Sequence, residues 1–191
     1  MPPKVRFTRE QIVDAAFRIA CKEGMEGITI RGIAATLGCS IAPIYVNFSR
    51  IDDVRQAVAE RAIDESRRIL AEVNTDNPFR DIGTASVRFA RDYPVIFRDL
   101  VLTPNEYMPA QSKELDPHLV SHMKEDPDLA GLSTDDLQRL LLKMRLFHTG
   151  FAAAVANGLL PGETGEEDII ELMSEVAGDL VSGARVRAKH R

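Results

Sequence analysis

The sequence predicts an all-α protein of about nine helices, in which a three-helix head joins a larger helical body. Apolar residues recur every three or four positions along most of the 191 residues, which is the spacing of one helix face. No stretch shows the strict apolar-polar alternation that is typical of a half-buried strand. Gly, Pro and Asn separate the segments, and Ser or Thr capping patterns open many of them.

The first helix is expected over about residues 9–22. Thr8 and Gln11 form a capping-box pattern before it, and Gly24 follows it as a stop signal. The apolar positions fall on one face and predict a stripe that packs inward, made of Ile12, Ala15, Ala16, Ile19 and Ala20.

Residues 29–54 contain two very short helical patterns that meet at a Gly-x-Ser turn. Thr29 can cap the first helix, and Gly38 sits where that helix must stop. Ser40 is expected to cap the second helix, with Pro43 in its first turn, where a missing N–H costs little. The first helix presents one apolar stripe, made of Ile30, Ile33, Ala34 and Leu37.

The second short helix is only about two turns long, so packing must hold it in place. Ile44 and Phe48, four residues apart, are the expected anchors. The first turn of this helix then faces outward. The arrangement is typical of a helix-turn-helix, whose second helix enters the DNA major groove. Because the turn carries little charge, we expect apolar contacts to base edges, such as Ile41 or Ala42 against a thymine methyl.

The same segment resembles the DNA-binding domain of the tetracycline-repressor (TetR) family of transcription regulators. That family's pattern runs Thr-x-x-x-Ile-Ala, then Leu-Gly-[Val/Cys]-Ser, then [Leu/Ile]-Tyr-x-[His/Asn]-Phe, then a lysine and an apolar residue. The resemblance covers about the first 55 residues. It rests on matches at Thr29, Ile33, Ala34, Leu37, Gly38, Cys39, Ser40, Ile44, Tyr45, Asn47, Phe48 and Val54.

The resemblance implies a regulator that binds a palindromic operator as a homodimer and responds to a small molecule in its body. One position departs from the pattern, because the lysine that meets a DNA phosphate in the family is Ile51 here. Arg50 and Arg55 are close enough in sequence to replace that contact. We expect phosphate contacts from Thr29, Arg31, Tyr45, Asn47 and Arg50, and base contacts from Ser40, Ile41, Ala42 and Pro43.

The sequence therefore divides into a DNA-binding domain, residues 1–50, and a ligand-binding and dimerisation domain, residues 51–191. Ser49 and Asp52 form a capping pattern that opens a long helix over 51–73, which contains no Gly or Pro. Asn77 caps a following helix that begins at Pro78. Further helices are expected over about 95–102, 116–124, 133–156 and 164–187, with a loop at 103–117.

The last two helices are rich in small residues, which lets helices approach closely. The resembled family forms its dimer through these two helices, as a four-helix bundle. Close packing within one subunit would produce the same pattern and remains an alternative. The residues expected at a dimer interface are Gly150, Ala153, Ala154, Leu172, Val176, Leu180 and Gly183.

Aromatic, methionine and histidine side chains are scattered through the body. Ordinary core packing explains any one of them, but as a set they favour an apolar cavity with a few polar groups. The residues expected to bind a ligand, whose identity the sequence does not give, are Phe89, Tyr93, Phe97, Tyr107, Met108, His122, Met144, Phe147, His148 and Phe151.

The charge distribution favours local contact with DNA. The net charge is −5, but residues 1–55 hold 8 Lys and Arg against 6 Asp and Glu, while the remainder holds 16 against 23. A slightly basic head on an acidic body suits a protein that binds DNA at one end. No signal peptide or membrane-spanning run is visible, so we expect a cytoplasmic protein with no membrane partner. Cys21 and Cys39 are expected to be reduced thiols.

Two other functions remain open at this stage. The head could be a vestigial scaffold on a ligand-binding or protein-interaction module, as the missing lysine and net acidity suggest. His118 and His122 share one helical face and could hold a metal ion in an all-α metal-binding protein. No cofactor is expected, and no phosphate loop, nucleophile elbow or paired-carboxylate motif indicates an enzyme.

Overall fold

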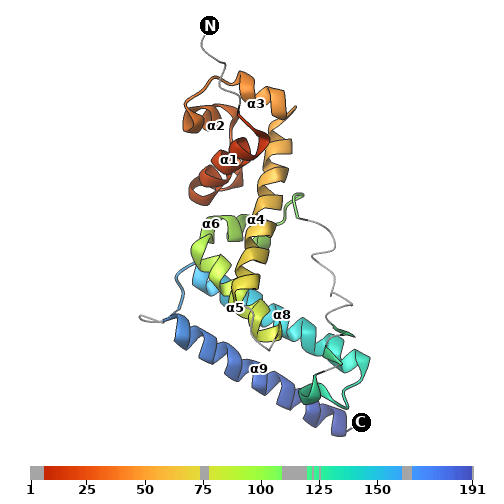
Figure 1. The fold of residues 1–191 in the computed structure, drawn as a ribbon. Coiled ribbons are helices and arrows are strands. Elements are labelled where there is room, and N and C mark those ends of the chain that lie inside the picture. The colour runs from red at the N-terminus through yellow and green to blue at the C-terminus, as the bar shows by residue number, and fades with distance from the viewer. Residues whose placement is uncertain are drawn as a thin grey trace. The chain divides into compact units, whose positions relative to one another are not determined.

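A computed structural model describes residues 7–73, 78–108, 120–121, 123–124, 126–160 and 165–190. It confirms the all-α fold class (Figure 1). None of the helices in these ranges is long and apolar enough to cross a membrane. The α-helices are α1 (Arg9–Glu23), α2 (Ile30–Leu37), α3 (Ala42–Asn47), α4 (Ile51–Val73), α5 (Pro78–Asp92), α6 (Pro94–Phe97), α8 (Thr134–Ala156) and α9 (Glu166–Lys189).

The chain forms two compact units, and the boundary between them passes through α5. Unit 1 comprises residues 1–72 and 89–108, and unit 2 comprises residues 73–88 and 109–191. The expected functional boundary at residue 50 coincides with the start of α4 at Ile51. Whether DNA and ligand binding divide at that residue stays a prediction.

Local capping explains where several helices begin. Thr8 Oγ1 accepts from Gln11 N at 3.2 Å, and Gln11 Oε1 accepts from Thr8 N at 2.9 Å, which confirms the capping box of α1. Ser133 Oγ likewise accepts from Asp136 N at 3.2 Å and caps α8. These side chains satisfy backbone N–H groups that have no partner inside the helix.

The capping pair expected at the start of α4 was wrong by one residue. Arg50 N, rather than Ser49 N, donates to a carboxylate at the start of α4, and that carboxylate is Asp53, at 3.0 Å. Asp52 and Asp53 follow one another, so the acceptor and the N–H that it satisfies can shift together by one residue. At the start of α9, Gly165 N donates to Asp168 Oδ2 at 2.9 Å.

The helix expected over 95–102 begins one residue earlier and changes character midway. After α6 the chain widens into a π-helical turn, Arg98–Leu102, in which Thr103 N donates to Arg98 O at 2.9 Å. Asn105 Nδ2 lies within 3.1 Å of the carbonyl oxygens of Asp99, Leu100 and Thr103 and satisfies the end of this turn.

The core of unit 1 lies between α1 and the segments that cover it. Residues of α1 pack against both α2 and α6. The predicted stripe of α1 is buried, as are the two expected anchors of the second short helix, Ile44 and Phe48, which are 0% and 4% exposed. Unit 2 has its own core between α8, α9 and the short helical turn Pro127–Leu129, made of Val120, Met123, Leu129, Leu137, Leu140, Leu141 and Met144.

Candidate functional site

The α2–turn–α3 segment has the geometry of a helix-turn-helix. Gly38 ends α2 in the left-handed region at φ 65°, where glycine pays no steric cost. Cys39 N donates to Ala34 O at 3.0 Å and closes the turn. Ile33 and Ala34 are buried on α2, as Ile44 is on α3, so a shared apolar core fixes the two short helices.

The cap of α3 differs from the sequence expectation. Ile41, not Ser40, precedes the first helical residue, and no side chain caps the helix. Pro43 is the second residue of α3, in its first turn, and its missing N–H falls among those that need no partner in the helix. Ser40 is exposed, and its hydroxyl is not used as a cap.

The outer surface of α3 is apolar and uncharged. Ile41, Tyr45 and Val46 are 45%, 55% and 84% exposed, and Ala42 is exposed beside them. Pro43 is half-buried. Val46 was not among the residues expected from the sequence, because a valine in a short apolar run resembles a core residue. Its exposure is the signal that adds it to this surface.

Two residues expected to contact phosphate also have structural partners. Thr29 Oγ1 accepts from Gly32 N at 3.0 Å and caps α2. Asn47 Nδ2 donates to Phe7 O at 3.3 Å and to Pro43 O at 2.9 Å. Both amide hydrogens of Asn47 are thus used inside the head, and its remaining acceptor oxygen cannot bind a phosphate oxygen. The geometry favours a positioning role for Asn47, at the end of α3.

Arg50 and Arg55 differ sharply in their surroundings. The Arg50 side chain is 73% exposed and forms an ion pair with Asp53 at 3.7 Å. The Arg55 side chain is 15% exposed and lies between Glu26 at 3.2 Å and Asp52 at 3.4 Å. Of the two arginines, Arg50 is the one whose side chain is open to solvent. Arg31 is also exposed.

Several residues expected to bind a ligand are instead part of the packing of unit 1. Phe89 and Phe97 are 6% and 2% exposed. Tyr93 lies between Phe17 and Phe89, with ring centroids 5.5 and 5.3 Å away. Tyr107 and Met108 are half-buried, and their N–H groups donate to Asn105 Oδ1.

The Tyr93 hydroxyl belongs to a network around a buried carboxylate. It donates to Glu65 Oε1 at 2.9 Å, and Arg68 and Arg61 donate to the same carboxylate at 2.5 and 3.0 Å. These hydrogen bonds, first of all that from Arg68, lower the pKa of Glu65 to about 2 despite its burial. Burial and the neighbouring Glu65 raise the pKa of Tyr93.

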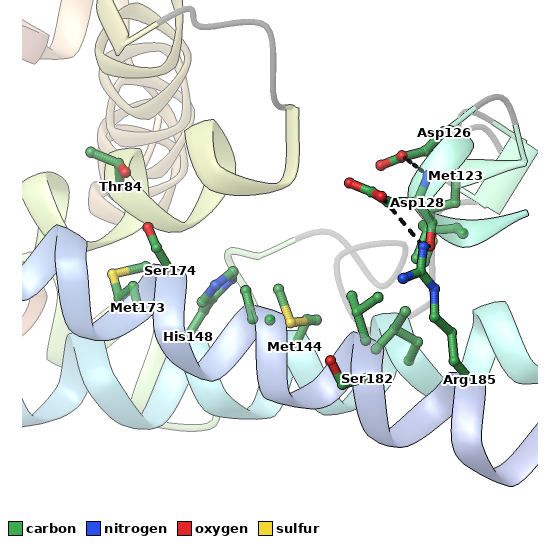
Figure 2. Close-up of a pocket in the computed structure, with 15 residues that line it drawn as sticks. Thr84, Met123, Asp126, Asp128, Met144, His148, Met173, Ser174, Ser182 and Arg185 are labelled. Atoms are coloured by element: carbon green, nitrogen blue, oxygen red, sulfur yellow. Dashed lines mark hydrogen bonds and ion pairs between the residues drawn. The ribbon is translucent and has the colours of Figure 1, made fainter.

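A cavity of about 400 Å³ lies within unit 2 (Figure 2). Of the residues expected to bind a ligand, Met144 and His148 line it. Phe147 and Phe151 lie next to His148 on α8, and His122 falls outside the described residues. The lining comes from α5, α8, α9 and the segment around Pro127–Leu129, and consists of Thr84, Met123, Asp126, Asp128, Leu129, Leu140, Met144, His148, Met173, Ser174, Ala177, Gly178, Val181, Ser182 and Arg185.

His148 is the buried ionisable side chain of this cavity. It is 8% exposed, and burial lowers the pKa of its imidazole, which is therefore neutral at pH 7. Gly83 of α5 leaves room for it, because a Cβ at that position would lie 2.7 Å from His148 Nε2. Most lining residues were missed from the sequence because they come from four separated segments and carry no shared spacing.

Of the expected dimer residues on α8 and α9, Gly150 and Leu172 are exposed, whereas Leu180 packs against the core of unit 2. Gly150 is exposed and has open space where a side chain would begin. Leu146, one turn before it, is 65% exposed, and Leu172 is 43% exposed. Ala153, Ala154, Val176, Leu180 and Gly183 are half-buried.

The metal-site alternative receives no support from the described ranges. They contain no group of three or more His, Cys, Asp or Glu side chains that could hold a metal ion. His118 and His122 both lie outside those ranges. The two cysteines, Cys21 and Cys39, are half-buried free thiols.

The chain is similar to known transcription regulators in fold and in sequence. A TetR-like transcriptional regulator from Rhodococcus sp. RHA1 matches it with a TM-score of 0.60 and 17% identity, over 95% of this chain and 100% of that one. The uncharacterised HTH-type transcriptional regulator YobS of Bacillus subtilis is 23% identical over 194 residues, which covers 100% of this chain and 99% of that protein.

A shorter but stronger sequence match is with the HTH-type nicotine-responsive transcriptional repressor HdnoR of Paenarthrobacter nicotinovorans. The two are 32% identical over 65 residues, which is 34% of each chain. In this match the chain spans about a third of the length of that relative. No protein-family model matches the chain.

Proposed function

We propose that this chain, a TetR-like helix-turn-helix transcriptional regulator by its fold and full-length sequence match, is a repressor that binds a palindromic operator as a homodimer. A small molecule bound in unit 2 would lower its affinity for DNA. The observation that carries the proposal is the outward surface of α3, formed by Ile41, Ala42, Tyr45 and Val46 on a helix that a buried core holds in place.

That surface suits readout of the major groove by apolar contact. Ile41, Ala42 and Val46 offer methyl groups to thymine, and the Tyr45 hydroxyl can donate to a phosphate. The exposed Arg31 and Arg50 are the charged groups that would hold the backbone on either side. Arg50 would then make the phosphate contact that a lysine, at the position of Ile51 in this chain, makes in the resembled family.

Dimerisation follows from the size of the reading surface and from the outer faces of α8 and α9. A six-residue α3 contacts too few bases to specify one site, and two-fold symmetry doubles the number. Leu146 and Leu172 are large exposed apolar side chains, and Gly150 beside Leu146 permits close approach of a partner helix. Two copies of this face would form a four-helix bundle.

The effector role rests on the cavity in unit 2. Its volume of about 400 Å³ suits a small molecule, and its lining combines apolar side chains with a few polar groups. An effector changes DNA affinity only if it binds one arrangement of the dimer better than another. We propose that the effector binds more tightly to the arrangement of the dimer that is free of DNA. Binding of the effector would then relieve repression.

Repression rather than activation is proposed from the similarity to HdnoR, which is named a repressor. The compared proteins are named transcriptional regulators, and we propose the same role, rather than an enzymatic one, for this chain. We place this activity in the cytoplasm, where an operator is accessible.

A gel-shift experiment with DNA flanking the chain's own gene tests the proposal. We expect a complex that specific competitor DNA removes and whose affinity falls steeply between 50 and 200 mM salt, as released counterions require. The competing view, a vestigial head on a ligand-binding module, predicts no complex or one that salt does not weaken.

A further inference from the structure

We propose that the cavity of unit 2 takes an elongated apolar amine, with its cationic group at Asp126 and its apolar chain extending toward His148. This inference names the chemical class of the effector and so rests on the proposed function. It depends on the cavity's shape, on the charges at one end and on a buried neutral ring at the other (Figure 2).

The lining of the cavity extends along α9. On this helix it runs from Met173 to Arg185, and at a rise of about 1.5 Å per residue this corresponds to roughly 18 Å. On α8 the lining runs from Leu140 to His148. Between the two ends the walls include the apolar side chains of Met144 and Val181, together with Ser174 and Ser182 of α9. An unbranched chain fits such a space, and methionines adapt to its contour.

One end of the cavity carries an excess of negative charge. Asp128 forms an ion pair with Arg185 at 3.3 Å, and the Arg185 guanidinium also donates to the Asp128 carbonyl oxygen. Asp126 uses one carboxylate oxygen to accept from Asp128 N at 2.8 Å. Within the described ranges, no positively charged side chain forms an ion pair with the Asp126 carboxylate. Among the lining residues, the uncompensated charge is therefore that of Asp126, and a cation would balance it.

The opposite end of the cavity carries two buried polar side chains and no ionised one. His148 is 8% exposed, and Thr84, 5% exposed, lines the same end. The imidazole of His148 can hydrogen-bond to a polar group of a bound molecule. This end therefore suits the far end of the molecule, with or without a hydroxyl group, and offers nothing to a second charge.

Isothermal titration of the full-length protein with three ten-carbon probes tests the inference. The probes are decylamine, which is cationic at pH 7, decanoate and 1-decanol. We expect decylamine to bind about tenfold or more tightly than either of the others. Equal or tighter binding of decanoate would overturn the proposal, because it would assign the site to Arg185 and an anion.

Three variants locate the site. Asp126→Asn keeps the oxygen that accepts from Asp128 N and removes the charge, so decylamine should lose about tenfold in affinity while decanol is unaffected. Asp135→Asn, an exposed residue on α8 outside the lining, is the matched control and should change neither. Gly178→Leu places a side chain in the open space at the cavity wall and should abolish binding of all three probes.

An unchanged affinity of the Asp126→Asn variant for decylamine would contradict the inference. Gel shifts in the presence of decylamine test separately whether binding in the cavity changes the affinity of the protein for DNA. Selective binding that leaves DNA affinity unchanged would support the cavity chemistry and contradict only the effector role.

Discussion

Arg50 and Arg55 illustrate what a single residue's surroundings decide. Both are arginines near the start of α4, and the sequence offers no way to choose between them. The fold buries Arg55 between Glu26 and Asp52 and leaves Arg50 73% exposed. Whether an arginine side chain is buried depends on how the head packs, so a sequence motif cannot predict it.

Replacement of Arg50 by Ala should weaken DNA binding and reduce the slope of log K against log salt by about 1, the loss of one phosphate contact. The matched control is Arg67→Ala, since Arg67 is 75% exposed and pairs with Asp64 three residues before it, but lies near the other end of α4. Fluorescence anisotropy at several salt concentrations measures both. An equal slope for Arg50→Ala and the wild type would show that Arg50 makes no phosphate contact.

Glu65 makes a second prediction at the residue scale. Its pKa of about 2 lies below the ordinary 4.5, so the ionised carboxylate stabilises the fold above pH 4.5, and this contribution is lost as the pH falls toward 2. The shift corresponds to roughly 3 kcal/mol at neutral pH. Urea unfolding should therefore show Glu65→Gln well below the wild type at pH 7 and closer to it at pH 3.

Glu72→Gln is the control for Glu65. Glu72 pairs with the same Arg68 but is 55% exposed, so its removal should change stability by less than about 1 kcal/mol. A stability gap for Glu65→Gln that stays constant between pH 7 and pH 3 would contradict the assigned ionisation.

At the scale of elements, the start of most helices follows from local chemistry. Thr8 with Gln11, and Thr29, cap helices where the sequence placed them. The cap of α3 and the π-helical turn after α6 were not predictable. The cap of α3 has no side-chain hydrogen bond, and the π-helical turn ends on three carbonyls that the side chain of Asn105 satisfies.

The candidate sites divide in the same way. The helix-turn-helix is continuous in sequence, so its motif identified most of its surface, and only Val46 was missed. The cavity is assembled from α5, α8, α9 and the segment before α8, and only Met144 and His148 were expected there. A site whose residues are scattered among helices has no spacing for a sequence pattern to report.

Two glycines test the account of the turns that follow α1 and α2. Gly24 and Gly38 both have positive φ, at 81° and 65°, so an alanine at either is strained. At Gly38 a Cβ meets open space, and the expected cost is about 1 kcal/mol. At Gly24 it would lie 2.6 Å from Asp99 Oδ2, the acceptor for Met25 N, and the expected cost is about 2–4 kcal/mol.

Thermal or urea unfolding of the two variants measures the difference. Equal losses of stability would show that the backbone conformation alone accounts for Gly24, and that the contact of Asp99 with the start of the Met25–Gly27 turn contributes little.

At the scale of the whole molecule, the proposal depends on a dimer. A charge in the exposed face of α8 should prevent it, so Leu146→Glu should sediment as a monomer and bind DNA at least tenfold more weakly. Leu159→Glu is the matched control, because Leu159 is 73% exposed but lies beyond the end of α8. A dimeric Leu146→Glu protein would place the interface elsewhere.

The most direct test of the central claim is selection of bound sequences from random DNA by the full-length protein. The account predicts an inverted repeat whose half-site centres are about 34–36 Å apart, or a multiple of that distance, because two symmetric α3 helices read the same face of the duplex. A single unrepeated site, or no enrichment above the starting pool, would contradict it.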